Sequence, residues 1–152
     1  MRVAVIALLV FACQRDTLRP RLQLSHGFTV TLTFSGGYPP FYDATAITSD
    51  GRVTREIHDD TRETHGSGSI SPTELAALRT QLESVGFADL EDHYGDSVPD
   101  GGRLVLEVDA GSGVRYVMCS GHCNPSNAPL PLHDVVGSIT AIRERIHSAA
   151  MK

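Results

Sequence analysis

Alternation of apolar and polar residues predicts a β-strand at the start of the folded region, near Gly27. The apolar positions are Phe28, Val30, Leu32 and Phe34, with threonines between them. A period of two places these side chains on one face of a half-buried strand. Residues 41–57 predict two further strands joined at Ser49-Asp50-Gly51, because Asp-Gly is a preferred sequence of tight hairpins.

A helix with a complete start and stop follows these strands. Ser71 is placed to be the N-cap, with Pro72 at the first helical position, and Glu74 closes a capping box. The apolar positions recur every three or four residues, at Leu75, Leu78, Leu82 and Val85. Gly86 supplies the left-handed stop. The pattern predicts one amphipathic helix between Ser71 and Gly86.

The last third of the chain predicts a second hairpin and a closing helix. Residues 103–120 contain two apolar stretches that turn between Ala110 and Gly113. Apolar residues then recur at helical spacing, at Val135, Ile139, Ile142 and Ile146, which predicts a helix from about residue 134 to 149. Three or four strands, a helix, two strands and a helix indicate an α+β domain. We expect one antiparallel sheet of about five to six strands with both helices packed on one face.

The N-terminal residues MRVAVIALLVFAC indicate where the protein resides. Arg2 precedes an unbroken apolar run, residues 3–12, which is about half of the roughly 20 residues that a membrane-spanning helix needs. Such a run is typical of a secretory signal. Its end, Val10-Phe11-Ala12-Cys13, resembles the bacterial lipobox, and this resemblance implies that Cys13 is lipidated. An ordinary cleaved signal and a cytosolic protein with an apolar N-terminus are the alternatives.

Three segments are therefore predicted along the 152 residues. Residues 1–12 are interpreted as a signal peptide, residues 13–26 as the lipidated Cys13 and a polar tether, and residues 27–152 as a single α+β domain. We expect the protein in the bacterial cell envelope, held to a membrane by its N-terminal lipid, with the domain in the periplasm or at the cell surface.

Net charge argues against one class of partner. The formal charge is −5 and the pI is about 5.7, with arginines scattered singly. A nucleic-acid partner requires a basic footprint, so we expect no nucleic acid. An envelope protein or a small ligand is the expected partner.

The sequence CSGHC contains the two cysteines that a lipidated Cys13 would leave over. Cys119 and Cys123 would lie in an oxidising compartment, and Gly121 permits the turn that a disulfide needs. We favour a disulfide, with free or slowly exchanging thiols as one alternative. A metal site is the other. Its weak candidate ligands are Cys119, His122, Cys123 and His133, and no second cysteine pair completes it. We expect no cofactor.

Two other polar stretches contain residue types that can bind a cation. HDDTRETH brings together five possible ligands, namely His58, Asp59, Asp60, Glu63 and His65, but a solvated connection between strands is the favoured interpretation. The acidic stretch DLEDHYGDSVPDGG, with His93, does not have the spacing of a calcium loop and is interpreted as a surface loop.

Aromatic residues around a double proline form the one candidate ligand groove. Tyr38, Phe41 and Tyr42 flank Pro39 and Pro40, and the alternative is that these rings cap the core. No catalytic residue is predicted, because the chain has no nucleophile elbow, no His-Glu-x-x-His motif and no phosphate-binding loop.

The motifs together resemble a known family. Gly37, Pro40 and Tyr42 form a Gly-x-x-Pro-x-Tyr motif, and a Ser-x-x-Glu-capped helix ending in Gly-Phe follows the Asp-Gly hairpin. FADLEDHY, Asp100 and RLVLEV come next. The pattern, from about residue 28 to 146, resembles a family of bacterial envelope proteins, often lipoproteins, known only as a domain of unknown function. Family members commonly carry a cysteine where this chain has Pro39.

The sequence as a whole favours a membrane-anchored bacterial lipoprotein whose domain is a binding or structural module without catalytic activity. The alternative is a metal- or thiol-dependent activity centred on Cys119, His122 and Cys123.

Overall fold

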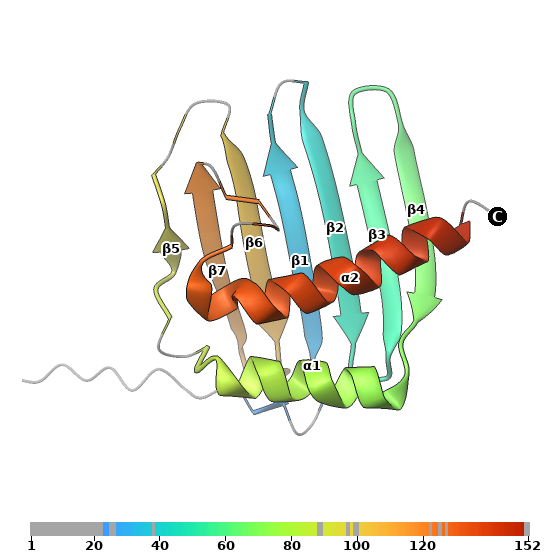
Figure 1. Ribbon diagram of the computed structural model, residues 1–152, viewed down its shortest axis with the longest axis vertical. Coiled ribbons are helices and arrows are strands. Elements are labelled where there is room, and N and C mark those ends of the chain that lie inside the picture. The colour runs from blue at the N-terminus through green and yellow to red at the C-terminus, as the bar shows by residue number, and fades with distance from the viewer. Residues whose placement is uncertain are drawn as a thin grey trace, which may run out of the picture.

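The computed structural model describes residues 23–24, 27–37, 39–87, 90–96, 98, 101–121, 123–124, 126 and 128–150. The strands are β1 (Thr29–Gly36), β2 (Phe41–Thr48), β3 (Arg52–His58), β4 (Glu63–Ser69), β5 (His93–Tyr94), β6 (Gly102–Asp109) and β7 (Val114–Gly121). The helices are α1 (Pro72–Ser84), α2 (His133–Ala150) and the short 3-10 helix η2 (Leu130–Leu132). The strands form one sheet in the order β4-β3-β2-β1-β6-β7-β5. Both α-helices lie on the same side of it (Figure 1), which confirms the α+β class and the single sheet.

Strand β4 is a correction to the sequence interpretation. Residues in HDDTRETHGSG were predicted to be a polar connection, yet Glu63–Ser69 pairs antiparallel with β3 along its whole length. The strand has no apolar alternation because glycine occupies two positions that face helix α2. A Cβ atom at Gly68 would lie 3.1 Å from Cγ1 of Ile146. Glycine therefore allows α2 to pass close over the sheet edge.

Strand β5 changes the sheet from antiparallel to mixed. His93 and Tyr94 lie in the segment that was interpreted as a surface loop, and they pair parallel with Met118 and Cys119 of β7. With β4 and β5 included, the sheet has seven strands instead of the expected five to six. Two residues of backbone pairing leave no periodic pattern in a sequence, so the prediction had no signal for this strand.

The hydrophobic core lies between the sheet and the two helices. Val30 and Leu32 of the central strand β1 are buried, and they lie opposite Val108 and Leu106 of β6, as the alternation predicts. The helices contribute their apolar positions, which are Leu78 and Leu82 from α1 and Val135, Val136, Ile139, Ile142 and Ile146 from α2. The core also contains Leu24, which belongs to the segment interpreted as the tether.

The predicted start and stop of α1 are confirmed. The backbone N–H of Glu74 donates to Oγ of Ser71 at 3.3 Å, and the backbone N–H of Ser71 donates to Oε2 of Glu74 at 3.0 Å. Pro72 opens the helix, and Gly86 has a φ of 62° just beyond its end. The local signals at both ends agree with the fold, since capping satisfies backbone groups that a helix leaves unpaired.

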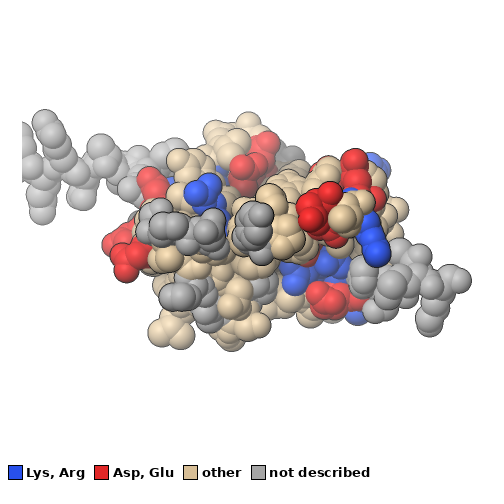
Figure 2. Space-filling view, turned by 90° about the horizontal axis from the view of Figure 1, so that it is seen from above, with Lys and Arg blue, Asp and Glu red and all other residues tan. Residues whose placement is uncertain are grey.

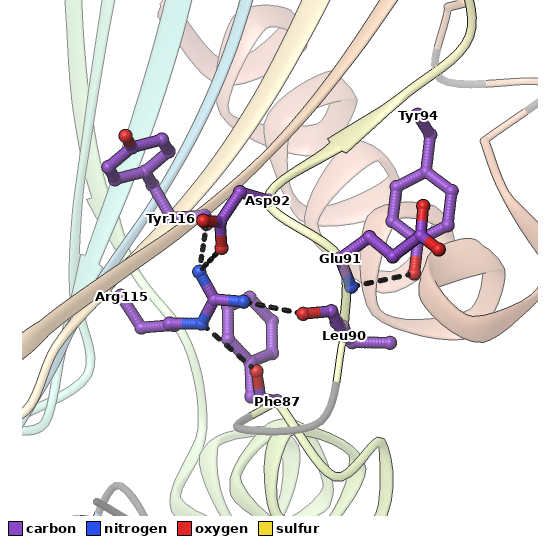
Figure 3. A network of polar contacts seen from close by, with 7 residues as sticks. All are labelled: Phe87, Leu90, Glu91, Asp92, Tyr94, Arg115 and Tyr116. Atoms are coloured by element: carbon purple, nitrogen blue, oxygen red, sulfur yellow. Dashed lines mark hydrogen bonds and ion pairs between the residues drawn. The ribbon is translucent and has the colours of Figure 1, made fainter. Parts of the chain in front are cut away.

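Arg115 fixes the connection between α1 and β5 onto strand β7 (Figure 3). Its Nε donates to the carbonyl oxygen of Phe87 at 3.3 Å, and its Nη2 donates to that of Leu90 at 2.6 Å. Its Nη1 donates to the Tyr116 carbonyl at 3.0 Å and pairs with Asp92. One guanidinium thus donates to three carbonyls, two in the connection between α1 and β5 and one in β7.

No helix in the described part of the chain is long and apolar enough to cross a membrane. The predicted signal peptide and Cys13 lie outside the described residues.

Candidate functional site

The two faces of the sheet differ in what covers them. One face packs against α1 and α2 and is called here the covered face; the opposite one, over which the described residues place no helix, is the open face (Figure 1). Strands β1 to β4 present mainly small or polar side chains on the open face, including Thr31, Thr33, Tyr42, Ala44, Ala46, Thr54 and Ser67. A protein face of this kind is accessible to a partner or ligand.

Two histidines and two glutamates meet on the open face of β3 and β4. Glu56 and His58 are two residues apart on β3, and Glu63 and His65 are two apart on β4, so each pair points to one face. The strand register places Glu56 opposite His65 and His58 opposite Glu63. These four residues are called the His–Glu cluster.

Contacts within the His–Glu cluster are short. Nε2 of His58 lies 2.6 Å from Oε1 of Glu56, and Nε2 of His65 lies 2.9 Å from Oε1 of Glu63. The two imidazole rings meet edge to face, with centroids 6.4 Å apart. The hydrogen bond to Glu56 raises the pKa of His58, the charge of Glu63 adds to the rise, and desolvation opposes it.

Three members of the His–Glu cluster have the geometry to bind a metal ion. One ligand atom from each of Glu56, His58 and Glu63 lies within 4.8 Å of the others. All three side chains are partly exposed, so an ion can reach them from solvent.

A concavity of about 470 Å³ adjoins the cluster on the open face. The small side chains of Thr31, Ala44 and Ala46 lie on neighbouring strands β1 and β2 and line it together with Tyr42 and His65. The Tyr42 ring also contacts the His58 ring, with centroids 5.7 Å apart. The concavity therefore combines a floor of short side chains with aromatic and ionisable groups, a composition suited to a polar ligand.

The predicted aromatic groove is divided between the two faces. Tyr42 lines the open-face concavity, whereas Phe41 packs against Phe34, with ring centroids 6.0 Å apart. Successive strand residues point to opposite faces, which explains this separation. Tyr38 lies outside the described residues.

The CSGHC segment contains the favoured disulfide. Cys119 and Cys123 are bonded, and their Cα atoms are 5.7 Å apart. Cys119 is buried in the core and Cys123 packs against it. In this state neither sulfur is a free thiolate, which is the form that binds metal or acts as a nucleophile.

The other two metal candidates of that loop do not add to a site. His133 begins α2, where its Nδ1 lies 3.5 Å from Oδ1 of Asp134. His122 lies outside the described residues. Next to the disulfide, strand β5 brings Nε2 of His93 to 3.0 Å from Oγ of Ser120.

The structure divides HDDTRETH between the ends of two strands, β3 and β4, and the turn that connects them. Oδ1 of Asp59 accepts hydrogen bonds from the backbone N–H groups of Thr61 and Arg62, each at 2.8 Å, and so closes the turn between β3 and β4. The Thr61 hydroxyl is the main cause that lowers the pKa of Asp59. The turn brings His58, Glu63 and His65 together and leaves Asp59 on the turn itself.

Sequence reasoning did not identify Glu56. The signal for it is the pair of segments Glu-Ile-His and Glu-Thr-His, each of which places an acid and a histidine on one face of a strand. Recognising the cluster requires the pairing of β3 with β4, and the sequence interpretation allowed a fourth strand before the first helix without assigning it to these residues.

Sequence reasoning also missed a charged cluster on the covered face. Asp43 of β2 accepts hydrogen bonds from Arg55 of β3, Nε to Oδ1 at 3.0 Å and Nη2 to Oδ2 at 2.8 Å. Nη1 of Arg143 in α2 lies 3.3 Å from Oδ2 of the same carboxylate. These three residues are called the buried ion cluster. They join the helix to two strands.

Acidic and basic side chains are interspersed at the end of the molecule seen from above in Figure 2.

Comparison of the chain with models of known protein families finds no match, and no curated protein sequence matches it. The resemblance to an envelope family therefore stays a prediction.

Proposed function

We propose that this chain is a lipid-anchored bacterial envelope protein whose domain binds a partner or ligand through the open face of the sheet, without catalysis. The observation that carries the binding role is the open-face concavity beside the His–Glu cluster. The N-terminal apolar run ending at Cys13 supports the anchor. The two parts of the proposal are tested separately.

The chemistry of the concavity supports recognition of a polar group. Short side chains at Ala44 and Ala46 let a ligand approach the sheet backbone closely, while Tyr42 offers an aromatic ring and a hydroxyl. His65 and the neighbouring glutamates supply ionisable contacts. A concavity of about 470 Å³ on an uncovered sheet face suits a peptide segment or an exposed side chain of an envelope protein.

Intact mass of protein extracted from bacterial membranes tests the anchor. We expect loss of residues 1–12, an added lipid mass on Cys13, and a gain of two protons when the Cys119–Cys123 disulfide is reduced. A chain that retains residues 1–12 without lipid contradicts the anchor.

Site-specific photocrosslinking in intact cells tests the binding face. A photoreactive residue at Thr54, which lines the concavity, should give a crosslinked envelope component that disappears when Ala46→Arg fills the concavity. The same probe at Glu83, exposed on α1, is the matched control. Equal crosslinking from both positions contradicts binding through the open face.

Turnover tests the absence of catalysis. The His93–Ser120 pair is the described arrangement nearest to a base and nucleophile. Hydrolysis of activated esters by the purified chain that is lost in Ser120→Ala would overturn the non-catalytic role.

A further inference from the structure

We propose that the His–Glu cluster is a binding site for a divalent transition-metal ion, of which Zn²⁺ is the test case. Glu56, His58 and Glu63 provide the first three ligands and His65 the fourth. This inference goes beyond the proposed function, because it requires neither the lipid anchor nor a partner on the open face.

Backbone pairing fixes the positions of the four ligands. The residues form two directly opposed cross-strand pairs in one register, so their Cβ atoms start within about 5.5 Å of each other across the strands. Three ligand atoms already lie within 4.8 Å of one another. His65 lies next to this set, with its Nε2 2.9 Å from Oε1 of Glu63, and is assigned the fourth position.

The donor atoms select the class of ion. Two imidazole nitrogens with two carboxylate oxygens suit Zn²⁺, Ni²⁺ or Cu²⁺, whereas Ca²⁺ and Mg²⁺ prefer oxygen ligands alone. Four protein ligands match the tetrahedral coordination of a Zn²⁺ site. Two glutamates also balance the charge of a divalent ion when both histidines are neutral.

The side chains of the His–Glu cluster are partly exposed and form ion pairs with one another, so a metal ion can reach them from solvent. Within the described residues, the ion-pair partners of Glu56 and Glu63 are the imidazoles of His58 and His65. Metal binding to these side chains therefore breaks no ion pair with Arg or Lys that the described residues contain. The partly exposed side chains allow an ion to enter without opening the sheet.

A Zn²⁺ titration of the full chain in detergent, without a histidine tag, tests the inference. Competition with a chromogenic chelator should give one Zn²⁺ per chain, and the melting temperature should rise with Zn²⁺, because an ion bound only to the folded state stabilises it. Ca²⁺ and Mg²⁺ should give neither effect.

Variants assign the ligands. His58→Asn and Glu63→Gln should each weaken Zn²⁺ binding by at least about tenfold, the smallest loss typical when even a supporting residue of a metal site is removed. His133→Asn removes an exposed histidine outside the cluster and should bind as the wild type does. Equal melting temperatures in EDTA establish that the variants are folded.

X-ray absorption at the zinc edge gives a readout that does not depend on the variants. We expect nitrogen and oxygen scatterers with an imidazole pattern. Sulfur scatterers, binding unchanged in the His58→Asn/Glu63→Gln double variant, or no stoichiometric Zn²⁺ would each overturn the inference. Equal crosslinking from Thr54 and Glu83 with Zn²⁺ binding intact would instead overturn only the proposed function.

Discussion

Strand β3 carries charged residues on both of its faces, and the two sets differ in their exposure to water. Arg55 points to the covered face, where the side chains of Asp43, Arg55 and Arg143 are 5%, 10% and 11% exposed. The next residue, Glu56, points to the open face, where its side chain is 45% exposed and that of His58 is 40%. Neighbouring residues thus belong to a buried and to an exposed charged cluster.

The comparison teaches that burial decides what a charged cluster can do. In the buried ion cluster each charge depends on its partners, because a buried charge left alone cannot be solvated. In the His–Glu cluster water solvates whichever group loses its partner, and the pairs themselves contribute little to stability. The first cluster is therefore suited to holding helix α2 on the sheet, and the second is free to exchange its protons for a ligand.

The largest expected effect is that of Asp43→Ala. It removes the buried carboxylate that the guanidinium groups of Arg55 and Arg143 share, although Nε of Arg143 still lies 3.3 Å from Oε1 of Glu144. We expect a loss of about 3–5 kcal/mol in the free energy of unfolding. Urea denaturation measures it. Glu56→Gln is the matched control on the open face and should stay within about 0.5 kcal/mol of the wild type without metal. Similar losses of stability in both variants would contradict the expected difference between the covered and the open face.

Arg115→Met is expected to have the next largest effect. The substitution retains an apolar side chain but removes the donors to the Phe87 and Leu90 carbonyls. We expect a loss of about 3 kcal/mol, since more than one acceptor loses its partner. Tyr116→Ser, on the open side of the same strand, should cost less than about 1 kcal/mol by the same measurement, because that side chain is 52% exposed. A larger cost for Tyr116→Ser would show that the open face is also part of the packing.

Loss of the disulfide comes third. Cys123→Ser opens a five-residue ring, and chain entropy predicts a loss of about 2 kcal/mol. The wild-type protein under reducing conditions should lose the same amount, whereas Cys123→Ser should be insensitive to reductant. A wild-type midpoint in urea that does not move on reduction contradicts a bonded pair.

The smallest effect concerns Glu74, which belongs to the helix layer but is partly exposed. Hydrogen bonds from the Ser71 backbone and hydroxyl lower the pKa of Glu74, and Arg145 in α2, 2.5 Å away, lowers it further. A lowered folded-state pKa means that the stabilisation is complete above the unfolded pKa of about 4.3. It is lost as the pH falls through the folded pKa.

The difference in melting temperature between the wild type and Glu74→Gln should therefore be present at pH 7 and disappear in strong acid. Its persistence in strong acid, where Glu74 is protonated in both the folded and the unfolded state, would contradict the sign of the pKa shift. A loss of stability in Glu74→Gln much smaller than that in Asp43→Ala would sharpen the comparison. It would show that the contribution of a charge to stability depends on its burial and not on membership of the helix layer.

Local signals in the sequence predicted the elements whose ends and buried faces are defined by residues close together in the chain. The alternation in β1, the Asp-Gly turn after β2 and the Ser71–Glu74 capping box each depend on residues close together in the chain, and the structure contains all three. The disulfide of CSGHC belongs to the same group, because its two cysteines are four residues apart.

The parts that were missed depend on pairing between distant segments. Strand β4 carries glycine where α2 passes, so its sequence has no apolar period. Asp43 occupies a core-facing position, and only the placement of Arg55 and Arg143 explains why a carboxylate is tolerated there. The His–Glu cluster combines both difficulties, since it needs β4 and its register with β3.

Strand β1 lies at the centre of the sheet, between β2 and β6. Strand β2 follows it after a short turn, whereas β3, β4, α1 and β5 all precede β6 in the chain. During synthesis β1 to β4 can pair as successive hairpins while the other edge of β1 has no partner. An unpaired edge of a partly folded sheet is a template for other chains. Until β6 pairs with β1, that edge of the partly folded domain is therefore open to pairing with another chain.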